Sequence, residues 1–234
     1  MEGYAAHVFN PNKFPVQLIL EKMEWSEDIL TAARVTNWQE FRDLFAAEII
    51  SPHEQITVGS QVVLFTDLSG STAMYNRVGD APAYVLVRNH FAILTQAVQE
   101  HHGGIVKTIG DAVMAVFSQV GDALEAVREM HEKLPAANPN PSAEGRLSLK
   151  SSLHLGPCLA VNANDKLDFF GTTINLAARM VTCCKGGDLT LSDELYQRSE
   201  TANFLRAIGK IAVPSEVAFR GFEKPHKVWR VPIV

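Results

Sequence analysis

Hydrophobic side chains form a continuous run from Val62 to Phe65, and a single carboxylate, Asp67, follows it closely. Short apolar runs with β-branched residues are typical of buried strands. The small polar stretch from Ser69 to Thr72, with a glycine in it, predicts a turn from this strand into a helix. Backbone N–H groups at such a turn can hold phosphate oxygens, and the carboxylate beside them can hold a divalent cation. The alternative role for a carboxylate at this place is a helix cap.

The stretch from Gly104 to Phe117 predicts a β-hairpin, because two short apolar runs flank Gly110 and Asp111. A long helical pattern connects this hairpin to the preceding strand. If that helix returns the chain to a parallel strand, the second arm of the hairpin fits between the two, antiparallel to both. The turn of the hairpin then lies beside Asp67. Two carboxylates at one sheet edge, next to a phosphate-binding turn, predict a two-metal site.

The pattern after the hairpin completes a β-α-β-β-α-β order. Residues 123–134 have helical periodicity, residues 147–155 alternate as a strand, and Gly156 with Pro157 predicts a turn into a short strand at 159–161. We therefore predict an α+β fold. Its core would be ferredoxin-like, with helices on one face of an antiparallel sheet, and C-terminal β/α additions would follow.

Residues 1–55 differ from the rest and are predicted to be an N-terminal extension or linker, which leaves residues 56–234 as the main domain. Residues 16–25 favour a strand. Thr36 and Gln39 have the spacing of a capping box. The helical stripe that follows consists of Trp38, Phe41, Leu44, Phe45 and Ile49. We expect this helical extension to pack its stripe on the domain. The alternative is that it transmits a signal as the tail of an upstream regulatory region.

Composition narrows the classes of function. The net charge of −5 argues against a nucleic-acid partner, whose binding usually requires a basic surface. No apolar run reaches the roughly 20 residues of a membrane span, and no signal-peptide pattern opens the chain. The three cysteines lack Cys-x-x-Cys spacing, which favours a reducing, cytoplasmic location. His101 and His102 have no further ligand at zinc-site spacing, so we expect no zinc site there.

Three motifs together resemble the catalytic domain of the class III nucleotidyl cyclases, the adenylate and guanylate cyclase family. They are Phe-Thr-Asp-Leu-Ser-Gly ending at Gly70, Lys-Thr-Ile-Gly-Asp at 107–111, and the stretch from Lys166 to Arg179. The resemblance extends from about residue 58 to the C-terminus. It implies an adenylate cyclase that converts ATP to 3′,5′-cyclic AMP and pyrophosphate. It also implies a head-to-tail homodimer in which each active site contains residues of both chains.

The resemblance implies that Asp67, Asp111 and the carbonyl oxygen of Leu68 hold two Mg²⁺ or Mn²⁺ ions in each active site. Arg220 stands where the family has a lysine that binds the terminal phosphates, which keeps the charge but changes the geometry. Ser71 stands where many members have phenylalanine. The turn expected to hold phosphate consists of Ser69, Gly70, Ser71 and Thr72.

Lys107 and Asp168 match the family positions that bind the base, and the partner chain would supply them. Adenine offers an acceptor at N1 to the lysine and an amino group at N6 to the carboxylate, whereas guanine would mispair with both. Asn175 and Arg179 lie four residues apart, so they share one helix face. By resemblance, Asn175 orients the ribose and Arg179 stabilises charge on the phosphate in the transition state.

Two other functions compete with an adenylate cyclase. A catalytically weak, cyclase-like sensor that only binds nucleotide is the first alternative, but Asp67, Asp111 and Arg179 are all retained. A diguanylate cyclase or polymerase-palm enzyme is the second, and the Gly-Gly-Asp-Glu-Phe signature of the diguanylate cyclases is missing.

Overall fold

The computed structural model describes residues 9, 11, 13–14, 30–45, 50, 54–137 and 148–233. The chain divides into two units, residues 1–30 and 31–234, and the second contains every element described below. The strand predicted at 16–25 lies outside the described residues. No helix in the described part is long and apolar enough to cross a bilayer.

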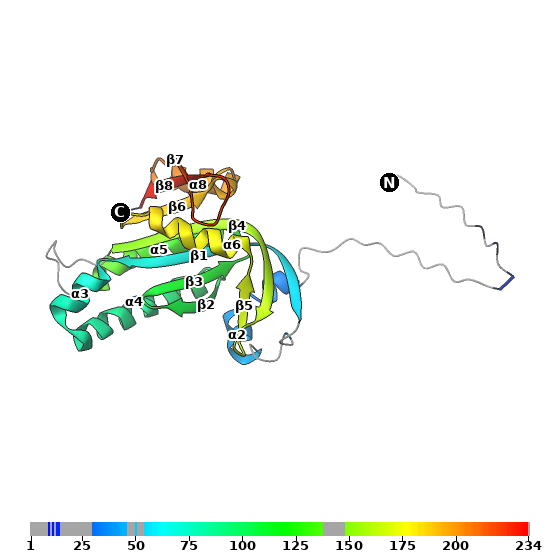
Figure 1. Ribbon diagram of the computed structural model, residues 1–234, viewed down its shortest axis with the longest axis horizontal. Coiled ribbons are helices and arrows are strands. Elements are labelled where there is room, and N and C mark those ends of the chain that lie inside the picture. Colours follow the sequence, from blue (N-terminus) through cyan, green and yellow to red (C-terminus); the bar gives the residue numbers. More distant parts are fainter. Residues whose placement is uncertain are drawn as a thin grey trace. The chain divides into compact units, whose positions relative to one another are not determined.

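The second unit is a mixed α/β structure built on one sheet (Figure 1). Its helices are α1 (Ala32–Val35), α2 (Gln39–Phe45), α3 (Ser71–Val78), α4 (Asp80–Glu100), α5 (Val120–Lys133), α6 (Thr172–Met180), α7 (Asp193–Tyr196) and α8 (Ser199–Ile208), with 3₁₀ turns at Leu134–Ala137 and Val181–Cys183. Its strands are β1 (Gln55–Ser69), β2 (Gly104–Ile109), β3 (Ala112–Phe117), β4 (Ser148–Asn162), β5 (Leu167–Phe170), β6 (Asp188–Ser192), β7 (Val213–Val217) and β8 (His226–Pro232).

The strands run in the order β2-β3-β1-β4-β6-β8-β7, and β5 pairs with β4 beside this path. Strand β3 pairs antiparallel with both β1 and β2. The predicted insertion of the hairpin's second arm between its neighbours is therefore confirmed. Strands β4 and β6 are parallel, and the other pairs are antiparallel.

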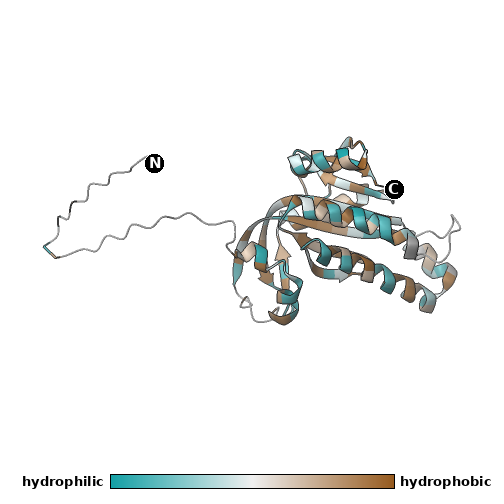
Figure 2. Ribbon diagram, turned by 180° about the vertical axis from the view of Figure 1, so that it is seen from behind, coloured by the Kyte–Doolittle hydropathy of each residue, from teal (hydrophilic) through white to brown (hydrophobic). Residues whose placement is uncertain are grey.

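Both faces of β1 are buried, which explains its uninterrupted apolar run. Val62 and Leu64 belong to the cluster that includes Leu94 of α4 and Leu124 of α5. Val63 and Phe65 belong to the opposite cluster, with residues of β5 and α6. Along the helices, hydrophobic and hydrophilic residues alternate as expected for elements with one covered side (Figure 2). The sheet is thus enclosed between α4 and α5 on one face and α6 on the other.

The turn predicted at Gly156 and Pro157 is wrong, because both residues lie inside the continuous strand β4. They pair with Gln61 and Ser60, next to a register shift in the β1–β4 ladder. Proline lacks an N–H and is tolerated at such an irregularity. A Cβ at Gly156 would lie 2.6 Å from Thr173 Oγ1, so this glycine permits the close approach of α6.

The predicted capping box is also wrong. Thr36 ends α1, and its hydroxyl donates to the carbonyl oxygen of Ala32 at 2.7 Å. Within the described residues, the helical stripe does not pack on the domain as expected: Leu44 is 73% exposed and Phe45 is 45% exposed. Ile49, the last residue of the predicted stripe, lies outside the described residues. The buried side chain of α2 is Arg42, at 5% exposure. Helix α2 is therefore attached through a charged group rather than through its apolar face.

Candidate active site

The two candidate metal ligands lie at the same end of the neighbouring strands β1 and β3: Asp67 near the end of β1, and Asp111 just before β3. In the β1–β3 ladder Phe65 pairs with Met114, and Val113 N–H donates to Thr66 Oγ1 at 3.1 Å. Continued by two residues, this register places Asp67 across from Ala112, the neighbour of Asp111. This ladder brings the end of β1 next to the turn of the hairpin, as the sequence predicts.

The surroundings of the two carboxylates differ. Asp111 Oδ2 is buried and has no hydrogen-bond partner among the described residues. Its backbone carbonyl lies 3.3 Å from His90 Nε2, and burial lowers the pKa of His90 to about 4, so this ring is neutral at physiological pH. Asp67 Oδ2 instead forms an ion pair with Lys150 Nζ at 3.2 Å. Burial of a carboxylate oxygen without a partner costs free energy, and a bound cation would compensate for this cost at Asp111 Oδ2.

The carboxylates do not form a complete metal cage. Among the described residues, no group of three or more His, Cys, Asp or Glu side chains is arranged to hold a metal ion. Magnesium is commonly bound by one or two carboxylates, with water and substrate phosphates as its other ligands. Asp67, Asp111 and the carbonyl of Leu68 fit that kind of site.

The turn between β1 and α3 has the predicted form. Ser69 ends the strand, and Gly70 has a φ of 82°, a left-handed conformation that favours glycine. Ser71 and Thr72 open α3. The N–H groups of a first helical turn have no partner within the helix and point outward, where an anion can accept from them.

Lys107 and Asp168 are brought into direct contact. Lys107 Nζ donates to Asp168 Oδ2 at 2.5 Å, although the two residues come from different strands, β2 and β5. The other oxygen, Asp168 Oδ1, accepts from Phe169 N–H at 2.8 Å. A lysine and a carboxylate held side by side offer one donor and one acceptor to a ligand at a half-exposed position.

Asn175 and Arg179 both lie on the exposed face of α6. The buried face of the same helix consists of Thr173, Ile174, Leu176, Ala177 and Met180. The loop that carries Arg220 is close to Arg179: a Cβ built on Gly221 would lie 3.9 Å from Arg179 Nη2. In the described part of the chain, no hydrogen bond or ion pair joins Asp67 or Asp111 to these two residues or to the Lys107–Asp168 pair.

Comparisons with known proteins identify the family and the fold of this chain. Residues 51–228 match the family profile described as Adenylate and Guanylate cyclase catalytic domain. The chain belongs to this family. Adenylate cyclase 2 of Rhizobium meliloti is 28% identical to this chain over 178 residues, which cover 71% of this chain and 49% of that protein. An uncharacterized protein of Mycobacterium tuberculosis is 28% identical over 214 residues, 81% of this chain and 38% of that protein. The chain thus spans less than half the length of both relatives.

Solved structures show the same fold. The adenylyl cyclase CyaB from P. aeruginosa superposes with a TM-score of 0.62 at 22% identity, covering 76% of this chain and 95% of that chain. The catalytic core of a rhodopsin-guanylyl cyclase with converted specificity, solved in complex with ATPαS, superposes with a TM-score of 0.63 at 20% identity. The match covers 76% of this chain and 98% of that chain.

Sequence reasoning missed two residues of this chain that contact the candidate site residues or the strands that carry them. Lys150 is paired with Asp67 across the β1–β4 ladder. Arg42 bonds the strands that carry Lys107 and Asp168. The sequence signal for Lys150 is its place in a strand of alternating residues. That signal identifies Asp67 as its partner only when the register between β1 and β4 is known.

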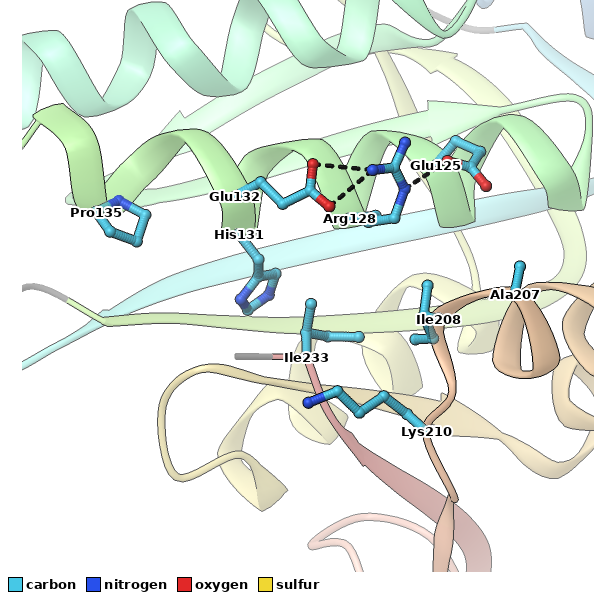
Figure 3. Close-up of a pocket in the computed structure, with 9 residues that line it drawn as sticks. All are labelled: Glu125, Arg128, His131, Glu132, Pro135, Ala207, Ile208, Lys210 and Ile233. Atoms are coloured by element: carbon cyan, nitrogen blue, oxygen red, sulfur yellow. Dashed lines mark hydrogen bonds and ion pairs between the residues drawn. The ribbon is translucent and has the colours of Figure 1, made fainter.

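A cavity of about 560 Å³ lies between α5, α8 and the chain after β8 (Figure 3). On its α5 side, Arg128 bonds Glu125 and Glu132 at 2.7 Å each, and Lys210 lines it from beyond α8. None of the predicted site residues lines this cavity. The cavity is therefore separate from the candidate active site.

Proposed function

We propose that this chain is an adenylate cyclase, which converts ATP to 3′,5′-cyclic AMP and pyrophosphate. The observation that carries this proposal is the Lys107–Asp168 ion pair. Its ammonium can donate to adenine N1 while its carboxylate accepts from the N6 amino group. Guanine presents an N–H and a carbonyl oxygen at these places, so both contacts would be mispaired at about 1–3 kcal/mol each.

Two Mg²⁺ or Mn²⁺ ions would be held by Asp67, Asp111 and the Leu68 carbonyl. The partnerless oxygen of Asp111 supports this assignment, since oxygen ligands suit hard cations. When bound, such ions neutralise phosphate charge and lower the pKa of the 3′-hydroxyl that attacks the α-phosphorus. Lys150 lies within reach of Asp67 and of any phosphate bound there, so it would add positive charge to the triphosphate site.

The remaining residues bind and orient ATP. The backbone N–H groups of the turn from Ser69 to Thr72 would donate to the phosphate oxygens, and Arg220 would bind the terminal phosphate. Asn175 would orient the ribose. Arg179 has no side-chain hydrogen bond within the described residues, so its guanidinium is available for the charge that develops in the transition state.

We also propose that the active site forms between two copies of the chain. Asn175 and Arg179 face solvent in one chain, and among the described residues no hydrogen bond or ion pair links them to Asp67 or Asp111. This is expected if each site takes residues from both copies. The catalytic domain would comprise residues 56–234 with a ferredoxin-like core. Residues 1–55 would be an extension that connects it to an upstream regulatory region, and helices α1 and α2 of this extension belong to the same compact unit as the domain.

The direct test is turnover by the purified protein. With Mg²⁺ or Mn²⁺ present, ATP is expected to yield cyclic AMP at a rate at least tenfold above the yield of cyclic GMP from GTP, because both base contacts favour adenine. Chromatographic separation of the two products measures the ratio. Binding of ATP without any turnover would support the alternative, a nucleotide-binding sensor, and preference for GTP would contradict the assignment of Lys107 and Asp168.

Shared sites predict complementation between two inactive variants. Lys107→Ala removes a base contact and Asp67→Ala removes a metal ligand. If the two residues act in the same site from different chains, a mixture of the two variants contains heterodimers with one intact site each. Cyclic AMP formation is expected to reappear on mixing, while each variant alone remains inactive at any concentration. Failure of mixed chains to regain activity, despite heterodimers detected by tagged pull-down, would count against the shared site.

A further inference from the structure

Two side chains of α2 hold the main chain of β2 close to Lys107. Ile105 N–H donates to Gln39 Oε1 at 2.7 Å, and Arg42 Nε donates to the Ile105 carbonyl oxygen at 3.0 Å. Strand β2 is at the edge of the sheet, so these outward-facing groups have no neighbouring strand to pair with. Helix α2 thus satisfies both polar groups of a residue that lies two positions before Lys107.

Arg42 also reaches the strand of the second base-binding residue. Its Nη2 donates to the Leu167 carbonyl oxygen at 2.5 Å, one position before Asp168, and its Nη1 donates to the Thr36 carbonyl oxygen at 2.9 Å. The guanidinium carbon lies 5.5 Å from the centroid of the Phe169 ring. One planar, five-donor group therefore bonds β2, β5 and the end of α1 at once.

No ladder joins the two strands that carry the base-binding pair. Strand β2 pairs with β3, and β5 pairs with β4. Among the described residues, the hydrogen bonds that connect β2 with β5 are the Lys107–Asp168 bond and the two bonds made through Arg42. When Lys107 and Asp168 turn to a bound base, Arg42 is the connection that remains.

The attachment of α2 is polar rather than apolar. A crevice of about 450 Å³ lies beside Arg42, between Leu44 of α2 and Val106 of β2. Burial lowers the pKa of Arg42 to about 10, against the attraction of Asp168 and Asp43, so the guanidinium stays charged at neutral pH. Val106 of β2 also packs against the cluster that contains Leu167 and Phe169 of β5. The directional guanidinium bonds therefore add to this packing in setting the position of the two strands.

We propose that Arg42 is a positioning residue for nucleotide selection: it fixes β2 and β5 relative to each other, and so the spacing of Lys107 and Asp168. Arg42 does not touch the nucleotide in this arrangement. It acts through the Ile105 and Leu167 carbonyls, and residues 32–45 thereby belong to the specificity machinery of the domain. This inference rests on the proposed function, in which Lys107 and Asp168 bind adenine.

The test compares ATP with GTP in the full chain carrying Arg42→Lys. Lysine keeps the positive charge, but its single ammonium group cannot replace the planar guanidinium, which donates to three carbonyl oxygens at once. Equilibrium binding and turnover are measured for both nucleotides. The preference for ATP over GTP is expected to fall about tenfold, mainly through a higher KM for ATP, whereas the Mg²⁺ concentration for half-maximal activity stays unchanged. Gln39→Leu releases the Ile105 N–H and is expected to shift the same ratio less, which provides a second measurement if Arg42→Lys folds poorly.

Two controls separate positioning from general destabilisation. Leu124→Ala removes a buried side chain of α5 and lowers stability, but it is expected to leave the ATP-to-GTP ratio unchanged. Arg206→Lys makes the same chemical change on the exposed face of α8 and is expected to alter nothing. An unchanged ratio in both Arg42→Lys and Gln39→Leu would overturn the inference while cyclic AMP formation by the unmodified chain upholds the proposed function. If the unmodified chain binds ATP and GTP without preference, both the inference about Arg42 and the proposed function are contradicted.

Discussion

Replacement of Asp111 by asparagine is expected to abolish cyclic AMP formation without unfolding the protein. Asparagine keeps the shape of the side chain but removes the charge that a divalent cation requires. Loss of one metal ligand removes several kcal/mol of transition-state stabilisation, and about 4 kcal/mol corresponds to a factor of about 10³ in rate. Initial rates with Mg²⁺ and Mn²⁺ measure the loss.

Stability should respond in the opposite way, because Asp111 Oδ2 is buried without a partner among the described residues. Removal of a charge from such a place costs little and can stabilise the fold. The thermal midpoint of Asp111→Asn is therefore expected to equal or exceed that of the unmodified chain. Asp122→Asn is the matched control, since this carboxylate is 37% exposed on α5 and its loss should leave activity intact. Retention of a tenth of the activity in Asp111→Asn would exclude it as a metal ligand.

The parts of this site that could be predicted from the sequence depend on local chemistry. The pair Gly110 and Asp111 between apolar runs indicates a hairpin, and the small polar residues before α3 indicate a turn. Both signals lie within a few residues, and each agrees with the structure. The place of the hairpin's second arm, between its first arm and β1, followed from the expectation that the helical connection returns the chain to a parallel strand.

The parts that could not be predicted depend on contacts between distant segments. Lys150 meets Asp67 only because β1 and β4 pair in one register, which no short pattern encodes. Gly156 and Pro157 look like a turn, and only the partner strand reveals an irregularity within β4. The apolar stripe of α2 suggested burial, but Arg42 is buried instead, because the carbonyl groups that accept from it belong to β2, β5 and the end of α1.

The second large effect is expected for Arg179→Ala. This guanidinium is exposed on α6 and makes no side-chain hydrogen bond within the described residues, so its removal should not change the fold. Loss of a donor aimed at developing charge typically costs about 2.7–4 kcal/mol, a factor of about 10²–10³ in kcat. KM for ATP should change little, because the interaction forms mainly in the transition state. Steady-state kinetics of the full chain separate the two constants.

Arg179→Lys tests the geometry of the same group. An ammonium keeps the charge but cannot make two parallel bonds to phosphate oxygens, so this variant is expected to recover only part of the lost rate. Arg206→Ala on α8 is the matched control, because it removes an exposed helical arginine far from α6 in the sequence. An Arg179→Ala variant that raises KM and keeps kcat would show that this residue binds ATP in its ground state. The transition-state role would then have to pass to another cation, for which Lys150 is the candidate, because its Nζ lies 3.2 Å from Oδ2 of the proposed metal ligand Asp67.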